Sequence, residues 1–419
     1  MLAMYTRLLP LPDHSFFLFG PRGTGKTTWL RARLPEARWF DLVRNEEFLR
    51  LLRNPSLFRQ AVEALPGGWV VVDEVQKLPR LLDEVHGLIA EHGSRYRFAL
   101  SGSSARKLRR MEVNLLAGRV INRTFFPLTG AELEYRFDID ELLALGALPK
   151  VRSEPRHAID VLEAYVANYL KEDIQQEALV KNLDSFSRFL EVAALMNGQT
   201  VNVNGIARDA GVPRPTVQRY FDTLVGTLIG VWLPAWRPRR KVKEVAHPKF
   251  YFFDTGVVRA ILGKLRDPLE SAERGHLLET LVLHELRSWM SIANTGGALS
   301  YWKTPSGSEA DFIWSRGAES VGIEVKAARE WRAEYGRVLR ELLEEKIVRR
   351  AFGVYLGSEI LKQGKLEILP LEDFMRRLNA GKVLAQGSSS AAVMAAVNAA
   401  NRRRRAGERK RGARKSRRR

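Results

Sequence analysis

The chain has 419 residues, of which 45% are apolar and 28% charged, so a single small domain and a largely disordered chain are both excluded. It has no cysteine, which excludes disulfides, thiolate zinc sites and cysteine nucleophiles. The formal net charge of +20 points to polyanionic partners, and no apolar stretch approaches the ~18 residues of a membrane helix, so we expect a soluble, cytoplasmic protein.

Changes of pattern along the chain predict three folded units and a tail. Residues 1–137 alternate short apolar runs with helical stretches, which predicts an α/β domain with a parallel sheet. Residues 138–248 are mostly helical, and residues 249–380 return to strands around a helix. Residues 386–419 are rich in Gly, Ser and Ala and then in Arg, which predicts a disordered basic tail that binds DNA or serves only solubility.

The first candidate site is a glycine-rich loop between an expected strand at 16–19 and an expected helix at 27–34. Its sequence fits G-x-x-x-x-G-K-[ST], whose backbone N–H groups cradle the phosphates of a nucleotide. Lys26 would reach the β- and γ-phosphates of ATP, and the Thr27 hydroxyl would hold Mg²⁺. The candidate nucleotide-binding residues of the loop are Gly20, Pro21, Arg22, Gly23, Thr24, Gly25, Lys26, Thr27 and Thr28.

A pair of acids follows an expected strand at 69–72. An apolar parallel strand should deliver Asp73 and Glu74 to the phosphate edge of the sheet. Asp73 would hold Mg²⁺ through water, and Glu74 would polarise the attacking water. The pair therefore favours hydrolysis of ATP over mere binding.

Two further features suit a nucleotide site. An expected strand at 96–100 runs into the serines of 101–104, and Ser101 or a neighbour would sense the γ-phosphate if this strand lies between the other two. Arg119 would stabilise phosphate charge within the chain or across a subunit interface, as in a homo-oligomer. Arg22 and Arg123 compete for that role, and Arg119 is equally readable as a surface arginine.

These motifs together carry a resemblance. The chain resembles a widespread prokaryotic family of AAA-type ATPases fused to a C-terminal domain of unknown function. The segments that carry the resemblance are the loop at 20–27, the run 71–76, the serine-containing run 100–104, Gly118-Arg119 and the run Tyr251-Phe-Phe-Asp-Thr-Gly256. The resemblance covers roughly residues 10–380. It implies an AAA-like P-loop NTPase fold, then a winged helix, then a domain resembling restriction endonucleases.

The helical unit contains a predicted helix-turn-helix. A helix over 203–210, a turn at Gly211 and a second helix over 215–224 give the spacing of that motif. Thr216, Gln218 and Arg219 would project from the second helix, which suits contacts with DNA phosphates. The basic residues that would line the following wing are Arg237, Arg239, Arg240, Lys241 and Lys243. The alternative is that the unit packs on its own ATPase domain or on a protein partner.

Acids and a lysine gather in the last unit. Because side chains alternate along a strand, Glu309 and Asp311 share one face, as do Glu324 and Lys326 on the next strand. Asp311 and Glu324 would hold a hard cation such as Mg²⁺, Lys326 would orient or activate water, and Glu279 on a helix at 275–289 adds a carboxylate. This resembles the nuclease pattern of an aspartate followed by acid-x-lysine, although such runs also occur by chance on half-exposed strands.

The interpretation that follows is a Mg²⁺-dependent ATPase that binds DNA and cleaves or remodels it. The alternative is a nucleotide-gated regulator that binds DNA or a protein, with an inert nuclease-like domain. A third option, protein remodelling, engages a peptide in place of DNA.

Overall fold

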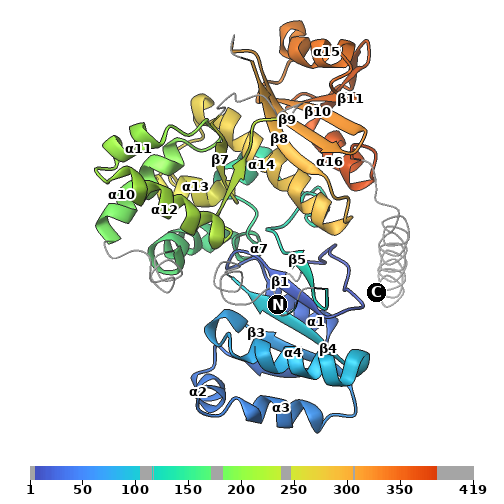
Figure 1. Ribbon diagram of the computed structural model, residues 1–419. Helices are drawn as coiled ribbons and strands as arrows, with labels where there is room; N and C mark the ends of the chain where they lie inside the picture. Colours follow the sequence, from blue (N-terminus) through green and yellow to red (C-terminus); the bar gives the residue numbers. More distant parts are fainter. Residues whose placement is uncertain are drawn as a thin grey trace, which may run out of the picture.

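The computed structural model describes residues 5–103, 116, 118–170, 183–236, 247–304 and 307–384. The expected tail at 386–419 and the five basic wing residues lie outside these ranges. No helix in the described ranges is long and apolar enough to cross a membrane. Figure 1 shows a P-loop unit (blue), a helical unit (green to yellow) and a C-terminal unit (orange), with the yellow helix α14 lying among them.

The P-loop unit is built on a five-stranded parallel sheet, in the order β2-β3-β4-β1-β5. Its strands are β1 (Phe16–Phe19), β2 (Arg38–Asp41), β3 (Gly68–Asp73), β4 (Tyr96–Gly102) and β5 (Ile121–Thr124). Its helices are α1 (Lys26–Arg33), α2 (Asn45–Arg53), α3 (Ser56–Glu63) and α4 (Leu81–His92). The strands expected at 16–19, 69–72 and 96–100 are confirmed, and β4 does lie between β1 and β3.

Alternation along the strands sends apolar side chains to both faces of this sheet. Phe17 and Phe19 of β1 pack in the cluster that contains Phe58 of α3 and Val85 of α4. The intervening Phe16 and Leu18 pack in the cluster formed with Trp29 and Leu30 of α1. Because both faces are covered, the strands are continuously apolar, as parallel strands require.

The helical unit follows and includes a pair of antiparallel strands, β6 and β7. It contains α6 (Ile139–Leu145), α7 (Pro149–Ser153), α8 (Ala158–Ala164), α10 (Leu183–Leu195), α11 (Val203–Asp209), α12 (Arg214–Gly226), β6 (Gly230–Leu233), β7 (Lys249–Phe252) and α13 (Thr255–Ile261). Helices α11 and α12 occupy the two predicted helix positions, and Gly211 turns between them with a positive φ of 64°. Since β7 pairs with β6 and α13 packs on α6, this unit extends past the expected boundary at residue 248.

The C-terminal unit is a six-stranded mixed sheet, in the order β12-β13-β11-β10-β9-β8. Its elements are α14 (Ser271–Ile292), β8 (Ala298–Lys303), β9 (Glu309–Arg316), β10 (Glu319–Lys326), α15 (Arg337–Glu344), β11 (Arg350–Tyr355), β12 (Leu361–Gln363), β13 (Leu366–Pro370) and α16 (Leu371–Asn379). Strands β8, β9 and β10 are antiparallel, and β11 is parallel to β10. The predicted helix at 275–289 and the two predicted acid-bearing strands are therefore present.

Glu285 of α14 joins the last unit to the first as a buried carboxyl. Its Oε1 accepts the Gly130 N–H at 2.7 Å, and burial raises its pKa to about 8. In the unfolded chain this carboxyl ionises above its ordinary pKa of 4.5, whereas in the folded chain it stays protonated up to a pH of about 8. Folding stability should therefore fall as pH rises through that window.

We expect Glu285→Gln to flatten this pH dependence, because glutamine retains the acceptor oxygen and never ionises. Between pH 5 and pH 8 the melting temperature of the variant should fall by a few degrees less than that of the parent. The reason for this size is that a change of about 1 kcal/mol in the free energy of unfolding shifts the melting temperature by about 2–4 °C. The exposed Glu330→Gln is the matched control. Equal slopes in both variants would contradict the assignment.

Candidate nucleotide and cation sites

The glycine-rich loop curls between β1 and α1. Gly23 and Gly25 have φ values of +82° and +90°, a region that favours glycine, so the loop depends on them for its curvature. The Lys26 side chain is buried, and its Nζ donates to the carbonyl oxygens of Gly20 at 2.7 Å and Pro21 at 3.1 Å. The ammonium thus lies inside the curl of the loop, where it meets oxygen acceptors.

Asp73 lies at the end of β3, next to the start of α1. Thr27 Oγ1 donates to its Oδ2 at 2.8 Å, and the Ser101 hydroxyl donates to its Oδ1. Burial raises the pKa of Asp73, and these two hydrogen bonds oppose the shift. The structure therefore brings together Thr27, Asp73 and Ser101, the three side chains expected at the metal and γ-phosphate positions.

Glu74 is held in a left-handed backbone conformation, with φ 57° and ψ 47°. Its N–H donates to Ser101 Oγ at 3.2 Å, and its carboxylate accepts Ser103 Oγ at 3.2 Å and the Gln76 amide. A non-glycine residue in this region is uncommon and strained, and such strain gathers at functional sites. The carboxylate is therefore oriented by two side chains at the edge of the sheet.

A cavity of about 980 Å³ opens over the loop. Its lining includes Arg22 to Thr28 and Glu74, together with residues that no sequence motif marked, namely Tyr5, Thr6, Arg7, Leu128, Pro149, Lys150, Ser153 and Glu154. Arg7 Nη1 donates to the Thr24 carbonyl at 2.7 Å, and Arg7 Nε forms a buried ion pair with Glu132 at 3.0 Å. The N-terminal segment and α7 thus complete the site from elsewhere in the chain.

The competing arginines lie in different places. Arg22 lines the cavity over the loop, whereas Arg119 is exposed and contacts His86 of α4. Arg123 lies on β5 and lines a separate cavity. Within one chain, therefore, Arg22 is placed at the loop, and Arg119 lies away from the loop and is turned to the outer surface.

The run Tyr251 to Gly256 has a structural explanation in its last three residues. The buried Asp254 caps α13 by accepting the Val257 N–H at 3.2 Å and also accepts the Ala147 N–H at 2.7 Å. A Cβ at Gly256 would lie 2.3 Å from the Leu145 carbonyl oxygen, so only glycine fits that position. These residues fasten α13 to α6.

The acids of the C-terminal unit meet at β9, β10 and α14. Asp311 Oδ2 accepts the Val325 N–H at 2.8 Å, and Lys326 Nζ pairs with Glu324 Oε1 at 2.5 Å. Burial and the neighbouring Asp311 raise the pKa of Glu324 to about 8 and that of Glu279 to about 7. The buried Glu324 Oε2 has no hydrogen-bond partner in the described ranges, which leaves an acceptor for a cation.

A lysine from the β-hairpin enters this cluster. Lys249 of β7 is buried, and its Nζ lies 2.5 Å from Glu309 Oε1 and 3.6 Å from Glu279 Oε2. Tyr251, two residues on, donates its hydroxyl to Glu279 at 2.9 Å. Lys249 therefore compensates Glu279 and Glu309, as Lys326 compensates Glu324 through Oε1, so the acceptor that the cluster leaves open is Glu324 Oε2.

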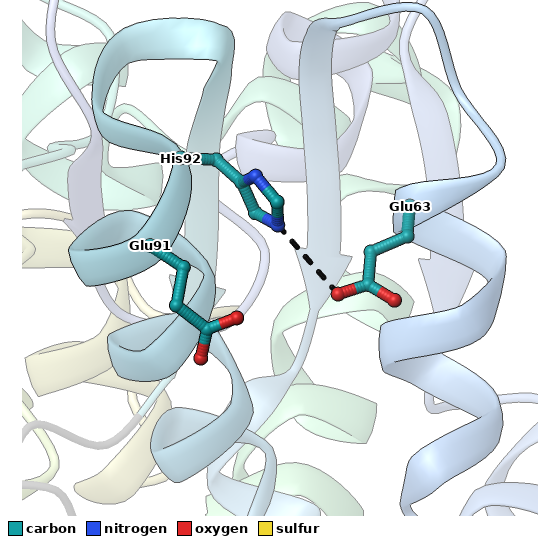
Figure 2. Close-up of side chains that lie close together, drawn as sticks. All are labelled: Glu63, Glu91 and His92. Atoms are coloured by element: carbon teal, nitrogen blue, oxygen red, sulfur yellow. Dashed lines mark ion pairs between the residues drawn. The ribbon is translucent and has the colours of Figure 1, made fainter.

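A tighter set of possible ligands lies in the P-loop unit. Among the described residues, one group of acids and histidines brings one ligand atom of each member within 4.8 Å of the others. This group is Glu63, Glu91 and His92 (Figure 2). Asp311, Glu324 and Glu279, all within the described ranges, do not form such a set. Arg59 Nη1 lies 2.8 Å from Glu91 and 3.4 Å from Glu63, so the set in Figure 2 is an ion-pair network that joins α3 to α4.

Comparison with known proteins agrees with this division of the chain. Residues 13–134 match the AAA domain family, and residues 136–267 and 274–374 match two domains of unknown function (DUF8612 and DUF4143). The uncharacterised proteins Rv2008c of Mycobacterium tuberculosis and Mb2031c of Mycobacterium bovis are each 28% identical over 382 residues, covering 88% of this chain and 81% of theirs. A point variant of RuvB from Thermotoga maritima is 19% identical, with a TM-score of 0.26, covering 53% of this chain and 82% of its own.

The N-terminal unit is accordingly an α/β P-loop NTPase domain of the AAA type. Its parallel sheet and the match over residues 13–134 agree on this class.

Proposed function

We propose that the protein is a Mg²⁺-dependent ATPase. The observation that carries the proposal is the connected set of side chains beneath the loop, in which Thr27 bonds Asp73, Asp73 bonds Ser101, and Ser101 accepts the Glu74 amide. Glu74 lies beside the cavity over the loop with its carboxylate oriented by Ser103 and Gln76. This arrangement suits a base that takes a proton from water attacking a γ-phosphate.

The residues present fit ATP and Mg²⁺. Lys26 Nζ is bonded to two loop carbonyls, and phosphate oxygens would give the same acceptors at the same place. Thr27 and Asp73 supply the hydroxyl and the carboxylate that would hold Mg²⁺. When bound, Mg²⁺ supplies positive charge that lowers the cost of charge developing on the phosphates.

Calorimetry with ATP and Mg²⁺, paired with an assay of phosphate release, tests the proposal. We expect saturable heat of nucleotide binding and phosphate release that requires Mg²⁺. Well-folded protein that gives no heat of binding would remove the basis of the proposal.

Arg119 completes the nucleotide site of a neighbouring subunit under this proposal. Its exposure and its contact with His86 on the outer surface support a role between chains of a homo-oligomer. An arginine that reaches the phosphates from a second chain stabilises charge in the transition state.

We further propose that the downstream units bind DNA and that the C-terminal unit acts on it. Gln218 and Arg219 are exposed on α12, and the β6–β7 hairpin follows that helix as a wing would. The order α14-β8-β9-β10-α15-β11 is compatible with the restriction-endonuclease-like domain that the family resemblance implies. The proximity of Glu324 to both Lys326 and Asp311 supports this proposal.

Incubation of supercoiled DNA with Mg²⁺ or Mn²⁺ separates cleavage from binding alone. We expect nicking in the parent and its loss in Asp311→Asn, because the amide cannot supply a charged ligand to the cation. The half-buried Asp373→Asn on α16 is the control. No nicking with either metal, together with salt-sensitive binding, would favour the nucleotide-gated regulator, and binding of a protein partner without DNA would favour remodelling.

A further inference from the structure

A second cavity lies where the three units meet. It has a volume of about 400 Å³ and is lined from β5, from β6, and from α14 and the start of β8. This volume is in the range of cavities that hold small organic ligands. The cavity is separate from the one over the glycine-rich loop, with which it shares no lining residue among those the structure describes.

Within the part of the chain that the structure describes, two arginines and no carboxylate line this cavity. Arg123 comes from β5 and Arg287 from α14, and neither has an acidic partner within the described ranges. Arg123 Nη1 donates to the carbonyl of Asn122 at 3.1 Å, and the Arg287 guanidinium lies 5.2 Å from the centre of the Phe126 ring. Burial lowers the pKa of both arginines, that of Arg287 to about 10.

An anion would compensate these charges. Half-buried cations without a counter-charge are costly, and guanidinium groups bind phosphate and carboxylate oxygens in bidentate fashion. The rest of the lining combines an apolar wall with a few polar groups, namely Phe126, Val231, Trp232, Leu233, Leu283, Met290 and Leu299 with Asn122, Thr124, Ser291 and Asn294. Such a wall suits a ring or another apolar body attached to the anion.

We propose that this cavity binds a small phosphorylated molecule of mononucleotide size, with its phosphate between Arg123 and Arg287 and its ring against Trp232. The proposal does not depend on hydrolysis at the glycine-rich loop. Because one wall belongs to each unit, the ligand would bridge the P-loop domain and both downstream units. Ser291 of α14 already bonds the Thr124 carbonyl of β5 at 3.0 Å, so two of these walls are in direct contact.

AMP is the probe, since it lacks the β-phosphate that the glycine-rich loop grips. In calorimetry with the full chain we expect saturable AMP binding that Lys26→Met leaves unchanged. Arg287→Met and Arg123→Gln should each weaken binding by on the order of tenfold to a hundredfold, through loss of a charge-assisted contact. The exposed Arg349→Gln is the matched control.

Comparison ligands define what is recognised. Adenosine tests the need for the phosphate, and ribose 5-phosphate tests the need for the ring; both should bind more weakly than AMP. Arg287→Met should fold, because methionine also has a long unbranched side chain and removes an uncompensated charge. If Arg287→Met does not fold, the binding of AMP by Arg123→Gln, a substitution on the edge strand β5, tests the proposal instead.

Three results would overturn the proposal. The first is no saturable binding of AMP up to millimolar concentration. The second is AMP binding that both arginine variants leave intact, or that adenosine equals. The third is binding of oligonucleotides alone with dependence on the two arginines, which would assign the cavity to a nucleic-acid path.

Discussion

Glu74→Gln is expected to lower the rate of ATP hydrolysis by roughly 10²- to 10⁴-fold, the range for loss of a general base. Glutamine has the same shape and accepts hydrogen bonds from Ser103 and Gln76, but it cannot take a proton from water. ATP affinity should change little, because the loop and Lys26 are untouched. Single-turnover phosphate release gives the rate, and calorimetry gives the affinity.

The exposed Glu36→Gln, on the turn after α1, is the matched control and should hydrolyse ATP at the parental rate. An unchanged rate in Glu74→Gln would show that another group activates the water. A loss of affinity that parallels the loss of rate would point to a binding role, because removal of a base acts on the chemical step.

Asp254→Ala is expected to destabilise the fold by about 2–4 kcal/mol, through loss of a helix cap and two buried N–H groups left without acceptors. This corresponds to a fall in melting temperature on the order of 5–15 °C. Asp254 is 4% exposed and accepts the N–H groups of Ala147, two residues after α6, and of Val257 in α13. Thermal unfolding followed by circular dichroism measures the change.

Below its melting temperature, the Asp254 variant should hydrolyse ATP at close to the parental rate, which separates an anchoring role from a catalytic one. Asp254→Asn should be milder, since one acceptor oxygen remains, and the exposed Asp267→Ala should be neutral. A variant with parental stability and no activity would contradict the structural explanation of this run of residues.

The core of the P-loop unit was predictable because buried parallel strands are continuous apolar runs. Phe16 to Phe19 and Trp69 to Val72 have that pattern, and Gly20 to Thr27 has a spacing that demands a strand before it and a helix after it. Strand β5 was missed, since Ile121 to Thr124 is a short, half-buried edge strand with a polar sequence.

Contacts between distant segments were not predictable from local pattern. Arg7 reaches Thr24 and Glu132 only because the N-terminal segment folds back on the loop, and no motif marks it. Lys249 precedes a run of aromatic residues, which predicts a strand but not its pairing with Glu279 and Glu309. The composition around residue 248 predicted a boundary, whereas the pairing of β6 with β7 and the packing of α13 on α6 show that the helical unit continues beyond it.

Strand β7 therefore joins two units. Its backbone pairs with β6 of the helical unit, and its side chains Lys249 and Tyr251 contact acids of the C-terminal unit. Proteolysis or an engineered split after Pro248 would remove the pairing partner of β6, whereas Lys249 would stay in one fragment with its acidic partners Glu279 and Glu309. A fragment for expression should therefore keep residues 138–384 together, so that β6 and β7 stay paired. A fragment that starts at residue 249 should aggregate, because the aromatic edge strand β7 would be exposed.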